Sequence, residues 1–180
     1  MAFVTFIIPS LGRPSLISSL SSLRAQTDSD WSALICFDRV QPTIQPDEKI
    51  QVLRYLPNHP TEWRQGAVRN FAIEHATSPW IGLLDDDDTV TPDYVATLKQ
   101  NADAQVVIFQ MRYQSGKVLP PNERRIRRGH VGISFAFQRE VFQKIKFTYR
   151  KCEDYYFLDD ARKLRYKIKF VPTVTYRVKH

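Results

Sequence analysis

The chain has 180 residues, a formal net charge of +7, 43% hydrophobic residues and 12% aromatic residues. This length fits one domain with a sizeable core, and the composition argues against extensive disorder. No apolar run approaches the roughly 20 residues that span a bilayer, so no transmembrane segment is expected. The basic surplus predicts an anionic partner, such as a nucleic acid, a membrane surface or a phosphorylated small molecule.

The first residues, MAFVTFIIPS, have an apolar centre but no basic start and no small-residue cleavage site. They predict a first strand and not a signal peptide, so we expect a cytoplasmic protein, with peripheral contact to a membrane left open. Cys36 and Cys152 have no second cysteine or histidine at zinc-ligand spacing. We therefore expect both to be reduced packing residues.

The first half of the chain alternates strand and helix patterns. A short β-branched run over 3–8, closed by Pro9, predicts a strand buried on both faces. Leucines at helical spacing predict a helix over 15–26. Similar patterns predict strands over 32–38, 50–56 and 80–84 and helices over 64–76 and 91–101. In the last of these helices, Thr91 is the expected N-cap and Pro92 the first helical residue.

The second half mixes short elements with a basic loop. Its patterns predict strands over 104–113, 131–138 and 167–178 and helices over 139–145 and 152–166. The stretch 114–130 is polar, contains proline and is strongly basic, so it predicts a mobile loop or an irregular hairpin. Strands that alternate with helices indicate a mostly parallel sheet covered on both faces. We therefore expect an α/β fold in a single domain.

Polar side chains follow several of the predicted strands, where ligands of open parallel sheets bind. The residues expected at this edge are Pro9, Ser10, Asp38, Arg69, Asn70 and the run from Asp85 to Asp88. Four adjacent carboxylates repel one another unless a cation or hydrogen-bond donors compensate. Mg²⁺ or Mn²⁺ in such sites is held by one or two carboxylates and substrate phosphates, so the pattern predicts a nucleoside diphosphate derivative as the ligand.

Three stretches resemble the signature regions of the family 2 glycosyltransferases with the GT-A fold. They are FIIPSLGRPSLISSLSSLRAQT, GAVRNFAIEHATSPWIGLLDDDDTVTPDYV and EDYYFLDDARKLRYKIKFVPTVTYRVKH. Their order and spacing are also similar to those of the family, and together they extend over nearly the whole chain. The resemblance implies a Rossmann-like sandwich with a smaller mixed second half, in which 1–101 binds the nucleotide sugar and 102–180 binds the acceptor.

Within the run LDDDDTVTP, the D-x-D motif of the family matches Asp85, Asp86 and Asp87 by position. The resemblance implies that Asp87 binds the metal ion that bridges the diphosphate. It also implies that Asp85 or Asp86 contacts the ribose or supports the metal. The residues alone leave an acidic turn that caps the next helix as the alternative. Asp88 is expected to be a structural turn residue.

Glu153 and Asp154 match the family motif that supplies the catalytic base. The chemistry needs such a group, because an acceptor hydroxyl must lose its proton as it attacks the anomeric carbon. We expect Asp154 to be the base and Glu153 to bind the acceptor or orient the site. An acidic pair that merely favours the dipole of its helix is the alternative.

Pro9, Ser10 and Arg13 resemble the nucleotide-binding turn after the first strand of the family, and Asp38 resembles the aspartate that holds the base or ribose. The family usually continues its second strand with a further aspartate and a Gly-Ser pair, whereas this chain has DRVQPT. Arg69 matches the arginine of the family's RN pair, where it would face the nucleotide or the diphosphate. An arginine on the helix surface is the alternative.

The chain ends in TYRVKH, which is similar to the closing strand of the family core. The resemblance implies that His180 completes the metal or diphosphate site, and a frayed terminal residue is the alternative. The arginines of NERRIRRGH, which include Arg124, favour a loop that closes over the sugar diphosphate or the acceptor. A solvated basic loop and a nucleic-acid contact are the alternatives, but no aromatic residue is interleaved with these arginines.

These features together predict a metal-dependent, inverting glycosyltransferase. We expect it to move a sugar from a nucleoside diphosphate donor, with UDP favoured, to a hydroxyl group of a glycan or glycoprotein acceptor. Mn²⁺ or Mg²⁺ would neutralise charge on the leaving diphosphate, and no nucleic-acid partner is expected. The alternatives are a non-catalytic nucleotide-binding module and a basic nucleic-acid-binding protein or nucleotidyltransferase.

Overall fold

The computed structural model describes residues 1–57, 65–121 and 125–179. The predictions for Arg124 and His180 fall outside these ranges. The described elements, in chain order, are β1 (Val4–Ser10), α1 (Leu16–Arg24), β2 (Trp31–Asp38), β3 (Ile50–Tyr55), α2 (Gln65–Glu74), β4 (Trp80–Leu83), β5 (Thr89–Val90), α3 (Tyr94–Gln100), β6 (Val106–Tyr113), β7 (Val118–Leu119), β8 (Phe135–Gln138), the 3₁₀ helix η1 (Arg139–Gln143), α4 (Glu153–Lys163) and β9 (Ile168–Val178).

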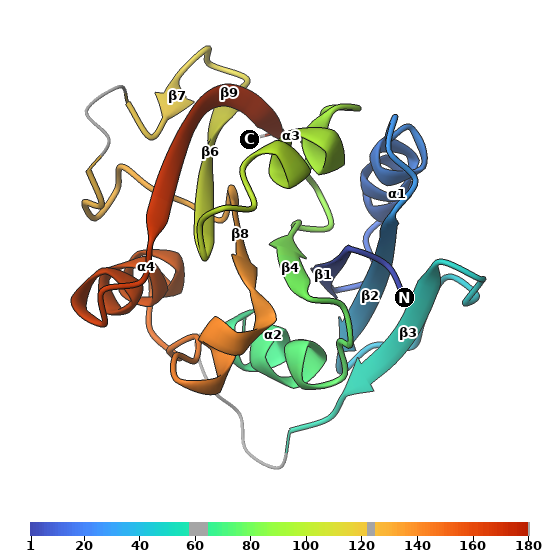
Figure 1. Ribbon diagram of the computed structural model, residues 1–180. Coiled ribbons are helices and arrows are strands. Elements are labelled where there is room, and N and C mark those ends of the chain that lie inside the picture. The colour runs from blue at the N-terminus through green and yellow to red at the C-terminus, as the bar shows by residue number, and fades with distance from the viewer. Residues whose placement is uncertain (58–64, 122–124, 180) are drawn as a thin grey trace.

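The strands form one nine-stranded sheet in the order β3-β2-β1-β4-β8-β6-β9-β5, with β7 paired to β6. β3, β2, β1 and β4 are parallel neighbours, and β6 pairs with β9 in parallel. β8 runs antiparallel between β4 and β6. The sheet curls across the molecule (Figure 1), and strands from both halves of the chain contribute to it. The predicted α/β fold with a mostly parallel sheet is confirmed.

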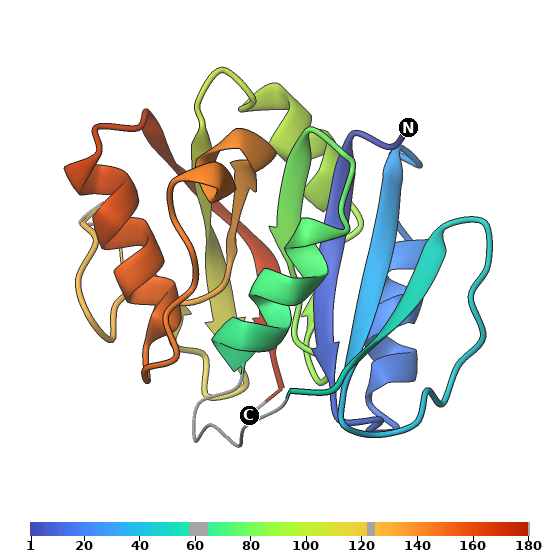
Figure 2. The ribbon, with the colours of Figure 1, turned by 90° about the horizontal axis from the view of Figure 1, so that it is seen from below.

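Helices cover both faces of the sheet, with α1 and α3 on one side and α2 and α4 on the other (Figures 1 and 2). Tyr94 of α3 packs between Phe6 of β1 and Phe109 of β6, with ring centroids 5.1 and 4.8 Å away. On the opposite face, the ring of Phe157 in α4 stacks on that of Phe147 at 4.5 Å. Buried aromatic pairs of this kind fix the helices on the sheet, because each ring removes a large apolar surface from water.

Both thiols are free; Cys36 is buried in the core, as predicted, whereas Cys152 is half-buried and lines a cavity. Among the described residues, no helix is long and apolar enough to cross a membrane. The strongly basic stretch predicted as a loop or hairpin contains β7, which pairs back onto the end of β6 through Met111 and Leu119. The hairpin alternative is therefore the correct one for its first part.

The start of α3 differs from the prediction. The helix begins at Tyr94 with Asp93 at its N-cap, and not directly after Thr91. The Thr91 carbonyl accepts a hydrogen bond from the Tyr94 amide at 3.2 Å and another from the Gln26 side chain at 2.7 Å. The first predicted turn is therefore a tight turn held by the segment that follows α1, through the Gln26 side chain.

The strand predicted over 131–138 forms only from Phe135 onward. The Phe135 amide donates to the Ile133 carbonyl at 2.7 Å, which bends the chain between these two residues. The residues before the bend leave the sheet and reach the edge where the parallel strands end. The prediction also missed β5, which follows the four aspartates and pairs antiparallel with β9.

Candidate active site

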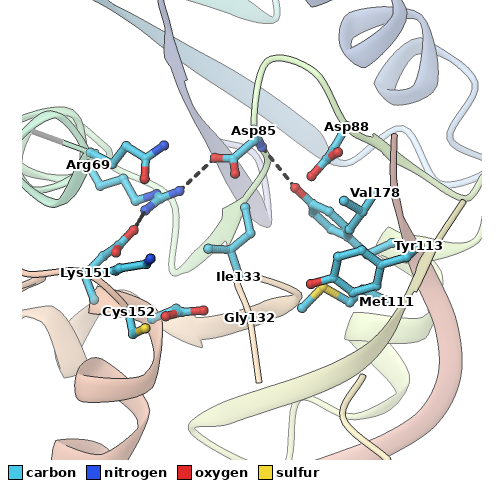
Figure 3. Close-up of a pocket in the computed structure, with 14 residues that line it drawn as sticks. Arg69, Asp85, Asp88, Met111, Tyr113, Gly132, Ile133, Lys151, Cys152 and Val178 are labelled. Atoms are coloured by element: carbon cyan, nitrogen blue, oxygen red, sulfur yellow. Dashed lines mark hydrogen bonds and ion pairs between the residues drawn. The ribbon is translucent and has the colours of Figure 1, made fainter. Parts of the chain in front are cut away.

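The parallel strands end at one edge of the sheet, and a cavity of about 350 Å³ lies there, shown in Figure 3. Asp85 and Asp88 reach it from the end of β4, and Arg69 reaches it from α2. Glu153 and Asp154 enter it from the first turn of α4. The two acidic motifs, which are far apart in the sequence, therefore share one cavity.

The four consecutive aspartates do not point the same way. Carboxylate oxygens of Asp85, Asp87 and Asp88 lie within 4.8 Å of one another. Asp86 turns away from them towards the segment after β1, where its Oδ2 accepts hydrogen bonds from the Ser10 hydroxyl at 2.7 Å and from the Leu11 amide at 3.1 Å. Three aspartates thus form a cluster, and the fourth anchors the turn after β1.

A turn at the end of β4 produces this division. The Asp88 amide donates to the Asp85 carbonyl at 3.2 Å, which closes the turn. The Ser19 hydroxyl of α1 then holds the Asp88 carbonyl at 2.6 Å. The backbone amide of Lys179 donates to Asp88 Oδ1 at 3.0 Å, so the carboxylate is held inside the cluster. Asp88 is therefore more than the turn residue predicted from sequence.

Burial and the neighbouring carboxylates change the pKa of Asp88 in this cluster. Burial raises the pKa of Asp88 to about 6, opposed by the hydrogen bond from the Lys179 amide and assisted by the neighbouring Asp85 charge. A bound divalent cation would remove this penalty, because it favours the charged form of each carboxylate. Three hard oxygen donors this close together fit Mg²⁺ or Mn²⁺, so the residues present suit the predicted ion.

Arg69 joins the two acidic motifs. Its side chain is 1% exposed, and one guanidinium nitrogen donates to Asp85 at 2.7 Å while another donates to Glu153 (Figure 3). Burial opposes the charge, but the two carboxylates outweigh it and hold the pKa of Arg69 above its ordinary value. The alternative of a helix-surface arginine is wrong, whereas its contact with a nucleotide stays a prediction.

Asp154 keeps a carboxylate in the cavity beside this ion-pair network. Its Oδ1 accepts the Tyr155 amide at 2.8 Å, and burial raises its pKa to about 6, assisted by the Glu153 charge. Gly132 lies opposite. A Cβ added there would come within 2.0 Å of Met111 Cε and 3.7 Å of Asp154 Oδ2, so any side chain would crowd the wall facing the carboxylate.

A second cavity of about 430 Å³ lies on the outer side of the aspartate cluster and is lined by Arg13, Ser15, Asp87 and Lys179. Arg13 pairs with Asp87 at 2.6 Å and with Asp86 at 3.5 Å. Two cationic side chains next to a carboxylate cluster suit a ligand that carries several negative charges and shares a metal ion with the carboxylates. The predicted Ser10 and Arg13 both contact Asp86, but of these three residues only Arg13 lines the cavity.

Some predicted residues lie apart from these two cavities. Asp38 is buried at the end of β2, where it forms an ion pair with Arg39 at 3.9 Å, and Pro9 precedes Ser10 in β1. Within the described part of the chain, neither Asp38 nor Pro9 lines the two cavities. Their proposed contacts with base and ribose stay predictions.

Sequence reasoning missed several lining residues. The hydroxyl of Tyr176 in β9 accepts a hydrogen bond from the Asp85 amide at 3.1 Å and lies beside Asp88. Lys151 and Tyr113 also face this cavity. The end of β9 carried a signal, since TYRVKH resembled the family, but the prediction placed the function on its last residue only. Tyr176, Val178 and Lys179 are the described members of that segment that line the cavities.

The fold and this edge of the sheet define a GT-A glycosyltransferase domain. The family model described as Glycosyl transferase family 2 matches residues 5–161, and the chain belongs to this family. No curated protein matches the chain in sequence. The predicted family and fold are thereby confirmed.

Solved structures with the same fold include two from different sources. TarS of S. aureus (residues 1–349), in a complex with UDP-GlcNAc, has a TM-score of 0.77 and 16% identity, over 100% of this chain and 59% of TarS. The mannosyltransferase PcManGT of Pyrobaculum calidifontis, in a complex with GDP-Man and Mn²⁺, has a TM-score of 0.75 and 16% identity, over 98% of this chain and 56% of the other. The chain thus spans less than two thirds of these proteins.

Proposed function

We propose that the chain is a metal-dependent, inverting glycosyltransferase that moves a sugar from a nucleoside diphosphate donor to an acceptor hydroxyl, with UDP as the favoured nucleotide. One observation carries the proposal. Arg69 ties Asp85 of the aspartate cluster to Glu153, directly before Asp154, so a donor site and a base lie in one cavity. Family membership supports the reaction class.

The donor site is the aspartate cluster with its two cationic neighbours. Asp85, Asp87 and Asp88 would hold Mn²⁺ or Mg²⁺. When bound, the ion neutralises negative charge on the diphosphate. Arg13 and Lys179 line the adjoining cavity and would pair with diphosphate oxygens. Arg13 would have to loosen its contact with Asp87 for this, which its half-exposed position permits.

Asp154 is the proposed base. Its carboxylate takes the proton of the acceptor hydroxyl as that oxygen forms a bond to the anomeric carbon of the donor. The bond from this carbon to the diphosphate oxygen breaks, and the nucleoside diphosphate leaves with the electron pair. Attack opposite the leaving group in a single displacement inverts the anomeric configuration. A pKa of about 6 suits the role, because the group is ionised near neutral pH yet still basic.

The choice of UDP rests on similarity and is the part most open to test. TarS binds UDP-GlcNAc and PcManGT binds GDP-Man in their structures, so relatives of the fold use different bases. Isothermal titration of UDP, GDP and ADP, each with and without Mn²⁺, distinguishes them. We expect binding of UDP that requires Mn²⁺ and disappears in Asp87→Ala.

The matched control is Asp160→Ala. It removes an exposed aspartate of α4 whose carboxylate pairs with the exposed Lys163 side chain at 3.4 Å. This variant should bind UDP as the unmodified protein does. Binding that ignores both Mn²⁺ and Asp87 would contradict the donor site. Preference for a polynucleotide over UDP at moderate salt would instead favour a nucleic-acid-binding protein.

Stereochemistry can be tested before the acceptor is known. Water can replace the acceptor at a low rate, and proton NMR of the sugar first released from an α-linked UDP-sugar identifies its anomer. We expect the β-anomer, and we expect Asp154→Asn to abolish its release while UDP binding persists. Release of the α-anomer would contradict inversion. Nucleotide binding with no release under any condition would identify a non-catalytic module.

A further inference from the structure

The basic surplus of the protein lies in one half of the chain. Residues 1–101 contain 8 Lys and Arg against 12 Asp and Glu, whereas residues 102–180 contain 18 against 7. The donor site uses Arg13 and Arg69 from the acidic half and only Lys179 near the end of the basic one. Most of the positive charge is therefore unexplained by binding of a nucleoside diphosphate.

Part of this charge surrounds a third cavity, of about 490 Å³, between the basic loop, α4 and β9. Its lining consists of Arg125, Ile126, Arg127, Arg162, Ile168 and Phe170. The three apolar members are partly buried and pack against the core. The lining that the structure describes thus combines an apolar floor with three arginines and contains no acidic side chain.

Arg162 is the α4 residue that lines this cavity. It contacts Asp159 at 2.8 Å, and the adjacent Lys163 contacts Asp159 at 2.8 Å and Asp160 at 3.4 Å. These pairs hold the two cations at the surface of α4. Both Arg162 and Lys163 are more than half exposed, so they can reach a ligand without desolvating fully.

The cavity is distinct from the donor site. Arg162 lies eight residues beyond Asp154 on α4, which corresponds to roughly 12 Å along the helix axis at 1.5 Å per residue. The basic loop spans this interval, because Arg128 lies against Cys152 at the start of α4 while Arg125 and Arg127 line the cavity. A ligand in the cavity would therefore lie beside α4 and not in the aspartate cluster.

We propose that this cavity binds an anionic amphiphile, that is, a phosphate group attached to an apolar body. Guanidinium groups pair with phosphate oxygens through two parallel hydrogen bonds, and Ile126, Ile168 and Phe170 offer the apolar surface that a bare phosphate would not use. Small-molecule sites commonly combine apolar walls with a few polar groups in about 300–1,000 Å³. The site goes beyond the proposed sugar transfer and needs no metal ion.

The test uses n-dodecyl phosphate below its critical micelle concentration, titrated calorimetrically into the whole protein with EDTA and no nucleotide. Inorganic phosphate and the uncharged n-dodecyl maltoside are the two half-probes. We expect one molecule of dodecyl phosphate to bind at least roughly tenfold more tightly than either half-probe, because only the amphiphile engages both arginines and apolar floor. Equal affinity for inorganic phosphate, or for the maltoside, would overturn the proposal.

Two substitutions, at the exposed Arg125 and at the partly buried Ile126, test the two halves of the lining. Arg125→Glu should weaken dodecyl phosphate binding by roughly tenfold or more, and Ile126→Asn should weaken it while leaving inorganic phosphate unchanged. The matched control is Arg54→Glu, an exposed arginine of β3 at the opposite end of the sheet, with the same charge change. Equal weakening by Arg54→Glu would mean a diffuse charge effect and would refute the site.

A second arm identifies the source of the phosphate. Vesicles of phosphatidylcholine with and without phosphatidylglycerol are sedimented with the protein. Capture that requires phosphatidylglycerol and is lost in Arg125→Glu assigns the site to bilayer lipid. Binding of dodecyl phosphate without vesicle capture assigns it to single lipid-linked molecules. Asp87→Ala should bind the amphiphile normally, so failure of the donor site and failure of this site are separable.

Discussion

Four aspartates follow β4, and one of them, Asp86, is hydrogen-bonded to the turn after β1. Two acidic residues begin α4, and the first of them, Glu153, is paired with Arg69. Asp86 and Glu153 are the anchoring residues of the two motifs. Their neighbours Asp87 and Asp154 keep carboxylate oxygens at a cavity. In each motif one acidic residue is thus an anchor, and an adjacent one lines a cavity.

The two motifs differ in how their cavity-facing carboxylates are surrounded. Asp87 lies beside the half-exposed Arg13, which pairs with it at 2.6 Å. Asp154 is enclosed, and burial raises its pKa to about 6. The enclosed position suits a base, since a base works best with a pKa near the working pH.

The largest expected effect concerns Asp154. Asp154→Asn removes the base but keeps the shape, so the transfer rate should fall by roughly a hundred- to ten-thousand-fold. The rate of the unmodified protein should rise with pH around a midpoint of about 6, as Asp154 loses its proton. Donor hydrolysis followed across this pH range measures both.

Two results would contradict the role of Asp154 as the base. A normal rate in Asp154→Asn would return the pair to the role of a helix-favouring acidic cap. A comparable loss in Asp160→Asn, on the same helix but exposed, would mean that the helix and not the base was disturbed.

The next effect concerns the bridge between the motifs. Arg69→Gln leaves Asp85 and Glu153 close together without their shared cation, and it should lower the free energy of unfolding by about 3 kcal/mol. Urea unfolding monitored by circular dichroism measures it. Arg24→Gln breaks an exposed ion pair with Asp47 and should cost at most about 1 kcal/mol. Similar values for both would contradict a buried bridge.

The pKa of Asp154 also predicts how stability depends on pH. Because the folded pKa of about 6 lies above the ordinary value of 3.8, the folded state holds a proton that the unfolded state loses as pH rises from about 4 to 6. The Asp154 contribution to stability should therefore fall by about 2 kcal/mol across this window and stay low above it.

The pKa of Asp88 is also raised to about 6, so Asp88 contributes to the pH dependence of stability in the same range and direction. Comparison with Asp154→Asn, which keeps Asp88, isolates the contribution of Asp154. Urea unfolding in EDTA at pH 4 and pH 7 should show a smaller loss of stability in the variant than in the unmodified protein. The variant should thus be less active yet more stable at pH 7. Identical pH dependence of the two proteins would refute the enclosed position of this carboxylate.

Much of the fold could be predicted because its parallel strands are continuous apolar runs. β1, β2 and β4 are almost wholly buried, and their patterns needed no tertiary information. The two-residue strands β5 and β7 could not be predicted, since each exists only through its partner strand. The late start of the strand predicted over 131–138, at Phe135, likewise depends on a bend that carries no sequence signature.

The site divides in the same way. Adjacent aspartates are chemically identical, so sequence could identify the run but not the directions of Asp86 and Asp88. Those directions come from Ser10 and from the Lys179 amide, which belong to distant segments. The position of Arg69 was predicted correctly on its helix, but its two carboxylate partners are visible only in the fold.

The smallest expected effect separates the anchoring aspartate from its neighbour. In metal-free protein, Asp86→Ala leaves the Ser10 hydroxyl and the Leu11 amide without their acceptor and should cost about 1 kcal/mol. Asp87→Ala should change stability by at most about 0.5 kcal/mol, because it loses a half-exposed ion pair with Arg13 and also removes repulsion within the cluster.

Added Mn²⁺ should reverse the order of these two variants. Mn²⁺ should raise the thermal midpoint of the unmodified protein and of Asp86→Ala, since both keep the clustered carboxylates, and should leave that of Asp87→Ala nearly unchanged. Thermal unfolding with and without the ion therefore gives two opposite rankings from one pair of neighbours. If Asp86→Ala loses the Mn²⁺ response and Asp87→Ala keeps it, the roles assigned to the two residues are exchanged, and the turn after β1 becomes part of the metal site.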